Sequence, residues 1–208
     1  AEATIVATDG RKMACSKIEN LPTSQEGNFI LPKKPATFLK NFLSKEQGDA
    51  VIRFSQRNAV ITTESYVMNC RLIEGKYPRY ESVIPQDNPN CVTVSRTAML
   101  STLRRVLIFS NASSSLIKLQ LGMGNMTISS QDIDFSMSAE ETLLCEYNGT
   151  PLSIGFNGTF LTEVLNYAEA DEVVIKMADA SRACIIVPAT KMENEDLLML
   201  IMPMLLGE

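Results

Sequence analysis

The side chains that most often carry catalysis are scarce in this sequence. It contains no histidine, so a Ser-His-Asp triad, a Cys-His pair and a histidine-ligated zinc ion cannot form within the chain. Glu140 and Glu141 are adjacent carboxylates, but such pairs in polar segments are more often solvated surface than an acid–base or metal site. Gly122-Met123-Gly124 lacks the third glycine and the lysine of a phosphate-binding loop and predicts a hairpin turn. We therefore expect no active site, no metal and no cofactor.

Cysteine usage and apolar runs indicate an intracellular chain outside the membrane. The five cysteines are widely scattered, form no C-x-x-C pair and predict small buried apolar side chains in a reducing cytosol: Cys15, Cys70, Cys91, Cys145 and Cys184. The longest apolar run, 197–202, is far shorter than the roughly 20 residues that a membrane span needs.

Length and composition describe an ordinary globular chain. It has 208 residues, 45% of them apolar, which is enough for one large domain or two smaller ones. Its net charge of −5 argues against simple DNA binding, because phosphate contacts need lysine and arginine.

Hydrophobic periodicity predicts an α+β fold with few helices and many antiparallel strands. Helical spacing appears at 35–45, at 99–107 after a candidate N-cap at Ser95, and at 160–165. Alternating or apolar stretches that predict strands include 66–72, 117–121 and 173–175.

Two of the three helical segments match at one spacing. Phe38 and Phe160 lie 122 residues apart, as do Leu39 and Leu161, and the strand patterns that follow agree at the same offset. This pattern predicts a duplicated module, with 85–90 as the linker between copies. The second copy has two helices and the first only the later one, so we expect the chain to begin inside a module.

Four collinear motifs resemble one family. Thr8-Asp9-Gly10-Arg11-Lys12-Met13, after Val6-Ala7, is similar to the A-T-D-G-x-R-L segment of the bacterial sliding clamp, the beta subunit of DNA polymerase III. The stretch 72–80 resembles its L-x-[ED]-G-x-[FY]-P-x-Y motif. Residues 154–157 resemble the start of the last helix of its third domain, and 201–204 resemble the V-M-P-M near its C-terminus.

The resemblance implies a DNA-clamp fold, with two inner helices per complete domain and antiparallel sheets outside. Residues 1–85 would be the C-terminal half of clamp domain two, truncated, and 90–208 would be domain three. Two three-domain subunits of such a clamp close head to tail into a homodimeric ring around duplex DNA. The implied function is that of a non-catalytic processivity factor in the bacterial cytoplasm. Its implied partners are duplex DNA, DNA polymerase III alpha, clamp-loader subunits and other proteins with a clamp-binding peptide.

The family binds partner peptides in a groove between domains two and three. The matching positions are Thr8, Gly10, Arg11, Lys12, Met13, Pro78, Ser82, Val83, Asn157, Phe160, Ser181, Ala183, Leu200, Ile201, Met202, Pro203, Met204 and Leu205. Lys12, Ser82 and Leu205 stand where the family often has arginine. The alternative is that Met13, Phe160 and Met202 are plain core; Met-rich apolar surfaces also suit adaptable peptide docking.

The resemblance also assigns charged and interface positions. The implied DNA-facing residues on the inner helices are Lys33, Lys34, Lys40, Arg104 and Arg105, and the implied subunit interface is Ile108 and Phe109. From the residues alone, the charges read as solvated helix faces and the apolar pair as a helix C-terminal cap. The rival functions are an unrelated duplicated α+β interaction module and a small hydrolase that uses carboxylates.

Overall fold

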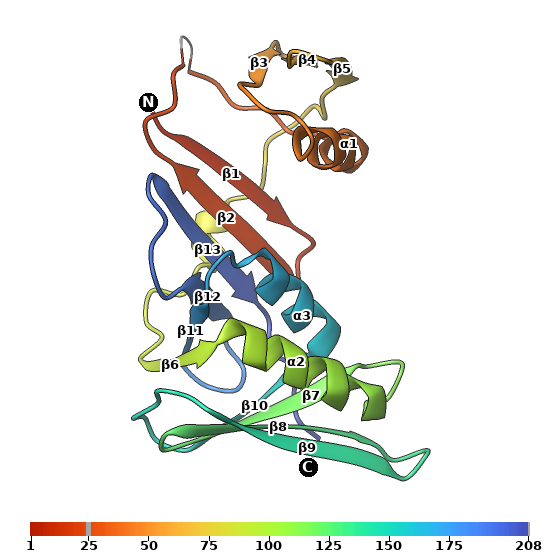
Figure 1. Cartoon of the computed structure of the whole chain (residues 1–208), viewed down its shortest axis with the longest axis vertical. Helices are drawn as coiled ribbons and strands as arrows, with labels where there is room; N and C mark the ends of the chain where they lie inside the picture. Colours follow the sequence, from red (N-terminus) through yellow and green to blue (C-terminus); the bar gives the residue numbers. More distant parts are fainter. Residues whose placement is uncertain (24–25, 208) are drawn as a thin grey trace. The chain divides into compact units, whose positions relative to one another are not determined.

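The computed structural model describes residues 1–23 and 26–207, which form two compact units (Figure 1). One unit contains Ala1–Pro22 together with the chain from Tyr80 onward, and the other is Thr23–Arg79. Both combine helices with antiparallel sheets, which confirms the predicted α+β class.

A six-stranded antiparallel sheet joins the two ends of the sequence. Its order is β1-β2-β13-β12-β11-β6, with these bounds: β1 Ala3–Thr8, β2 Lys12–Ile18, β6 Asn90–Ser95, β11 Glu172–Met177, β12 Cys184–Pro188 and β13 Glu195–Ile201. The hairpin β1–β2 pairs through β2 with β13, in a register that runs from Ile18 opposite Glu195 to Lys12 opposite Ile201. The sheet therefore contains strands from both of the domains expected from the sequence.

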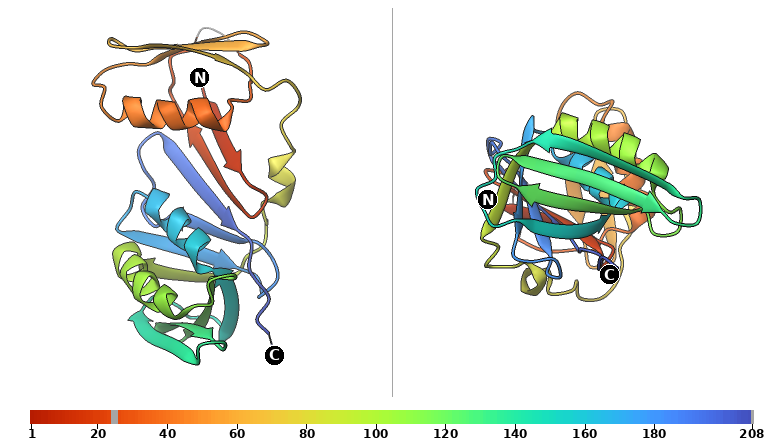
Figure 2. Two further views of the ribbon diagram at one scale, coloured as in Figure 1. Left: turned by 90° about the vertical axis from the view of Figure 1, so that its right-hand side faces the viewer. Right: turned by 90° about the horizontal axis from the view of Figure 1, so that it is seen from below.

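A four-stranded sheet and two helices complete this unit. The strands are β7 (Leu116–Gly122), β8 (Asn125–Asp132), β9 (Met137–Leu144) and β10 (Leu152–Asn157), in the order β10-β7-β8-β9. Helix α2 (Arg96–Val106) lies across this sheet (Figure 2) and continues into the short helix η2 (Leu107–Phe109). Helix α3 is Gly158–Tyr167, and the short helix η1 (Tyr80–Val83) precedes β6. The hairpin turn predicted at 122–125 joins β7 to β8.

Local hydrogen bonds fix both helices at their N-termini. The Ser95 side chain accepts a hydrogen bond from the Ala98 N–H, which confirms the predicted cap, and Asn157 caps α3 in the same way. At the other end of α3, the Arg96 guanidinium donates to the carbonyl of Ala170 at 2.6 Å. A cation there also complements the negative end of the helix dipole.

The main core lies between these helices and the two sheets. Alternate residues of β7 and β11 point inward, as the strand periodicity predicts, and the α2 and α3 side chains Leu103, Leu161 and Leu165 are fully buried among them. A side chain at one of these positions is removed from water on every side, so shortening it leaves a cavity.

The unit Thr23–Arg79 repeats the later half of this arrangement. Helix α1 (Lys33–Leu43) is followed by β3 (Val51–Phe54), β4 (Asn58–Thr62) and β5 (Val67–Arg71), as α3 is followed by β11, β12 and β13. Its core is small, built on Ala59, Ile61 and Leu72. Phe38 is 56% exposed, whereas its repeat counterpart Phe160 packs against the main core.

The five cysteines differ in burial, although the sequence predicts all of them to be buried. All five thiols are free; Cys15 and Cys184 are buried as expected, Cys70 and Cys145 are half-buried, and Cys91 is exposed on β6. The pattern of β6 explains the exposure of Cys91, because Val92 and Val94 take the inward positions and the residues that alternate with them, Cys91 included, face outward. Burial raises the pKa of the Cys184 thiol to about 12, with Asp179 adding to the shift. Among the described residues, no helix is long and apolar enough to cross a membrane.

We predict that Gly155→Ala destabilises the unit by about 1–3 kcal/mol, as overpacking of a tight site does. A Cβ at this position would lie 2.6 Å from the Met204 carbonyl oxygen and 2.8 Å from Leu206 Cδ2. Urea unfolding measures the loss. Gly207→Ala is the control, because a Cβ there meets nothing within 4 Å. Equal stability of the two variants would show that the C-terminal segment does not pack tightly against β10.

Candidate functional site

The turn between β1 and β2 is held by its own side chains. The Thr8 hydroxyl donates to the Lys12 carbonyl at 2.9 Å and accepts from the Gly10 N–H at 3.1 Å. Asp9 Oδ1 accepts from the N–H groups of Arg11 and Lys12 at 2.9 and 3.0 Å. Gly10 has a φ of +83°, which favours glycine. Thr8, Asp9 and Gly10 therefore fix where β2 begins.

Because successive strand residues point to opposite faces, β2 and β13 place side chains on both sides of the sheet. Lys12 lies on the side of α3 and Met13 on the other. Ile201 is buried in the main core and offers no side-chain surface, whereas Leu200 lies opposite Met13 on the outer side.

Met13, Ala183 and Leu200 form a buried apolar group on the outer side, here called the Met13 cluster. Partly buried side chains pack around it: Val6, Tyr80, Ile84 and Leu198. An open depression of about 420 Å³ shares Ile84 and Ala183 with this cluster, and its full lining is Ser82, Val83, Ile84, Pro85, Gln86, Asp87, Arg182 and Ala183. Val83 is 55% exposed there. The predicted positions Met13, Ser82, Val83, Ala183 and Leu200 thus come together.

On the other side of the sheet, Phe160 of α3 meets two consecutive cations. Lys12 Nζ lies 4.1 Å from the ring centroid, within cation–π range, and Arg11 Cζ lies 5.9 Å from it. Lys12 Nζ also contacts Asp9 Oδ2 at 2.6 Å and Glu163 Oε2 at 3.0 Å. The lysine therefore ties the β1–β2 turn to α3.

These contacts shift the pKa of both partners. Partial burial alone would raise the pKa of Asp9, but hydrogen bonds from the Lys12 ammonium and from two backbone N–H groups outweigh it and lower that pKa to about 2. Burial alone would lower the pKa of Lys12, but its bonds to Asp9 and Glu163 raise it. Both groups are charged at neutral pH.

The C-terminal segment after β13 is held by two backbone hydrogen bonds, one to the β1–β2 turn and one to β10. The Met202 N–H donates to the Arg11 carbonyl at 2.9 Å, and the Met204 N–H donates to the Gly155 carbonyl at 2.8 Å. Met202 is 42% exposed and Leu205 82% exposed, while Pro203 and Met204 are half-buried. The backbone that carries the exposed Met202 side chain is thus fixed beside the turn.

Three other predicted positions have local structural roles or lie elsewhere. Asn157 accepts from the Phe160 N–H and donates to the Ser114 carbonyl, so its amide is used within the fold. The Ser181 hydroxyl donates to Asp179 at 2.7 Å in a turn. Pro78 belongs to the unit Thr23–Arg79 and is exposed there.

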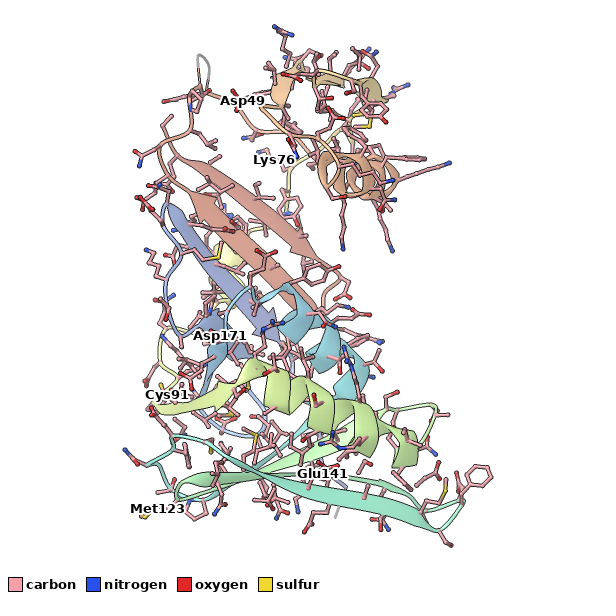
Figure 3. All side chains as sticks on the ribbon, viewed as in Figure 1. Asp49, Lys76, Cys91, Met123, Glu141 and Asp171 are labelled. Carbon is pink, nitrogen blue, oxygen red and sulfur yellow. The ribbon has the colours of Figure 1, made fainter. Side chains whose placement is uncertain are left out.

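The predicted DNA-facing cations differ in their surroundings. Lys33, Lys34 and Lys40 are exposed on α1, and Arg104 is exposed on α2 without an ion-pair partner among the described residues. Arg105 instead donates to both carboxylate oxygens of Glu141, at 2.7 and 2.6 Å. Figure 3 marks Glu141 on β9, beneath α2.

Sequence reasoning missed two carboxylates. Glu141 was expected to be solvated surface; it is half-buried and also accepts from the Thr102 hydroxyl at 3.1 Å. The alternating burial along β9 is only a weak signal that Glu141 is half-buried, because its partner Arg105 on α2 is far away in sequence. Nothing local pairs Glu163 with Lys12, since that contact depends on the packing of α3 over β2.

The two residues of the predicted subunit interface lie in η2. Ile108 is 72% exposed and Phe109 is 36% exposed, so neither is buried by its own unit.

Among the described residues, no group of three histidine, cysteine, aspartate or glutamate side chains is placed to hold a metal ion.

We predict that NMR titration gives the Asp9 carboxyl a pKa near 2 and that Lys12→Met raises it, because the ammonium that stabilises the carboxylate is gone. Since the folded pKa lies below the ordinary value, the stabilisation by Asp9 is present above about pH 4 and is lost as the pH falls toward 2. The stability difference between wild type and Lys12→Met should shrink over that range. Lys17→Met, an exposed lysine on the same strand, is the control; an unshifted Asp9 in Lys12→Met contradicts the assignment.

Comparison with known proteins gives matches along nearly the whole chain. The family models for the central domain and the C-terminal domain of the DNA polymerase III beta subunit match residues 1–79 and 81–205. The beta sliding clamp of Pseudomonas aeruginosa is 31% identical over 200 residues, which cover 96% of this chain and 53% of the relative. That of Borreliella burgdorferi is 29% identical over 208 residues. The chain spans about half the length of the curated relatives it matches.

Solved structures agree. A DNA polymerase sliding clamp from Pseudomonas aeruginosa with ligand superposes with a TM-score of 0.90 at 29% identity, covering 99% of this chain and 55% of that one. A sliding clamp from Bartonella birtlesii bound to griselimycin gives 0.90 at 30% identity, with the same coverage. An unrelated duplicated module is therefore not favoured. The sequence motifs, the clamp fold and the two matched family models together show that this chain belongs to the DNA polymerase III beta subunit family, the bacterial beta sliding clamps.

Proposed function

We propose that the chain serves a sliding clamp as its partner-docking portion and as part of its DNA-encircling ring. It would act as a non-catalytic processivity factor in the cytoplasm. The observation that carries this proposal is a set of exposed apolar side chains in this unit. Met202 is held by its N–H at the Arg11 carbonyl in the β1–β2 turn, Leu205 follows in the same C-terminal segment, and Val83 lines the depression. In a family of sliding clamps, such a surface suits a peptide carried by a polymerase or a clamp-loader subunit.

The Met13 cluster and the depression next to it would receive the apolar anchors of that peptide. The cluster itself is buried, so it forms a firm wall, and Val83 supplies exposed apolar area at the rim. Burial of such area contributes roughly 25 cal/mol per Å², and a few well-packed anchors dominate most peptide interfaces. Met202 is 42% exposed and adds an adaptable thioether to the apolar surface offered to the peptide.

The cations on α1 and α2 would face duplex DNA inside the ring. Exposed lysine and arginine on helices give a weak, sequence-independent and salt-sensitive hold on phosphate, which permits sliding. The acidic net charge of the chain fits such a weak hold, because it limits non-specific adhesion elsewhere on the surface.

Ring closure would use the exposed side chains of η2. We assign residues 1–85 to the later half of clamp domain two and 90–208 to domain three, and we assign Ile108 and Phe109 to the head-to-tail interface of a homodimer. The support for the interface is the exposure of both apolar side chains at the end of α2. Exposed apolar side chains are common on protein surfaces, so the assignment of this pair to the subunit interface also depends on the family membership of the chain.

We predict that Val83→Asp weakens binding of a clamp-binding peptide about tenfold or more, because a carboxylate replaces apolar rim area at a contact of hot-spot strength. Fluorescence polarisation with a labelled peptide measures the affinity, and thermal unfolding checks the fold. The matched control is Val67→Asp on β5, where the valine is 65% exposed. If wild type and Val83→Asp bind the peptide with equal affinity, Val83 does not contact it and the depression is not part of the groove.

We predict that Arg104→Gln reduces duplex binding more than Arg105→Gln does. The Arg105 guanidinium is already bound by Glu141, whereas Arg104 is exposed and without an ion-pair partner among the described residues. Loss of one phosphate contact lowers the slope of log affinity against log salt by about 0.9. Anisotropy of a labelled duplex over a salt series measures both variants. The opposite order, with Arg105→Gln changing the slope more, contradicts the assignment.

A further inference from the structure

The chain contains two closely similar tetrapeptides, each an aromatic residue followed by Asn-Gly-Thr. One is 147–150, in the connection between β9 and β10, and the other is 156–159, where β10 leads into α3. Packing requires both glycines: a Cβ at Gly149 would lie 2.5 Å from the Tyr147 hydroxyl oxygen, and one at Gly158 would lie 2.5 Å from Leu107 Cδ2. A difference in reactivity between the two asparagines therefore has to come from their surroundings.

An asparagine followed by glycine can lose its side-chain ammonia without a catalyst. The main-chain nitrogen of the glycine attacks Cγ of the asparagine, the Cγ–Nδ2 bond breaks, and the leaving amide nitrogen takes the main-chain proton and departs as ammonia. Water then adds to one of the two carbonyls of the cyclic imide, which gives aspartate or isoaspartate. The reaction needs an unbound side-chain amide, an unbound main-chain N–H and a backbone that can rotate, and glycine hinders the attack least because it has no Cβ.

The fold blocks this reaction at Asn157. Its Oδ1 accepts from the Phe160 N–H at 3.0 Å, and its Nδ2 donates to the Ser114 carbonyl at 2.8 Å. The attacking nitrogen is also bound, because the Gly158 N–H donates to the Ser115 carbonyl at 2.8 Å. Gly158 is buried at the start of α3, so its backbone cannot rotate without opening the helix.

The surroundings of Asn148 are the opposite. Asn148 and Gly149 are exposed and lie outside the helices and strands. Within residues 1–23 and 26–207, neither the Asn148 side chain nor the Gly149 N–H makes a hydrogen bond. The residues on either side are fixed, since Tyr147 is buried and its hydroxyl donates to the Thr150 carbonyl at 2.6 Å. The reactive pair is thus an exposed, unbonded step between two anchored residues.

We propose that Asn148 is a site of spontaneous deamidation in the folded protein, whereas the fold protects Asn157. The only co-reactant is water. The product carries a new negative charge next to the exposed Glu146. Where the product is isoaspartate, the main chain also gains one methylene between Tyr147 and Thr150, the two residues that the 2.6 Å hydrogen bond joins. Isoaspartate at this position should therefore disturb the connection between β9 and β10 more than aspartate does.

The test follows both asparagines in one sample. The whole chain is incubated at physiological temperature and mildly alkaline pH, and peptides are mapped over time by mass spectrometry. We expect deamidation of the peptide with Asn148 to be about tenfold faster or more than that of the peptide with Asn157, because the latter must first open its cap and helix end. The rate at Asn148 should rise with pH, since the attacking nitrogen must lose its proton.

The unfolded chain is the control for sequence context. In concentrated urea the two sites should react at similar rates, because each is an Asn-Gly-Thr segment after an aromatic residue. Asn148→Gln should remove the fast reaction, since glutamine would have to close a larger ring. The matched control is Asn69→Gln, which changes an exposed asparagine on β5 and should leave the rate at Asn148 as it is.

A label and a variant identify the product and its effect. An isoaspartyl methyltransferase with radiolabelled methyl donor should label the aged wild-type chain and leave aged Asn148→Gln unlabelled. Asn148→Asp carries the charge without the extra methylene, so a lower unfolding temperature of the isoaspartate form than of Asn148→Asp would support the strain on the Tyr147–Thr150 bond.

Three results would overturn the proposal. One is a folded chain in which Asn148 is as stable as Asn157. Another is equal, fast deamidation of both sites in the folded chain, because the fold then protects neither. The third is a rate difference that persists unchanged in urea, which would assign the selectivity to the neighbouring residues in sequence and not to the structure.

Discussion

The pairing of β2 with β13 is the constraint on which this site depends. It aligns Met13 with Leu200 and Lys12 with Ile201, so residues close to the two ends of the sequence become neighbours in one sheet. The alternation of the two strands then supplies an apolar wall on one side and a charged, aromatic group on the other. A shift of one residue in this register would exchange the two sides and destroy both.

The site is rigid where it must be and adaptable where a partner would bind. Side-chain hydrogen bonds hold the β1–β2 turn, and backbone hydrogen bonds hold the segment after β13 at Arg11 and Gly155. The side chains that remain exposed on this frame are apolar or flexible, such as Met202 and Arg11. A preformed frame reduces the ordering cost of binding, and methionine adapts to different anchors. That combination suits a family whose members are sliding clamps.

Local patterns in the sequence predicted much of the fold and less of the site. Helix caps and strand alternation depend on neighbouring residues, so α2 with its cap at Ser95 and the turn at 122–125 could be predicted. The resemblance supplied the groove positions, and those on the outer side do gather around Met13. The ion pairs of Lys12 with Glu163 and of Arg105 with Glu141 could not be predicted, because each joins a strand to a helix distant in sequence. The exposure of Cys91 could have been found, since its neighbours Val92 and Val94 claim the inward positions.

The most direct test of this account is a methyl NMR titration of the methionines with a clamp-binding peptide. Met13, Met202 and Met204 lie in or beside the proposed groove, whereas Met123 is exposed at the β7–β8 turn and Met126 is buried in the main core. The account predicts shifts of the Met13, Met202 and Met204 methyl signals, with those of Met123 and Met126 unchanged. Shifts at Met123, or at Met68 in the other unit, with Met13 and Met202 unaffected, would place the peptide elsewhere and contradict it.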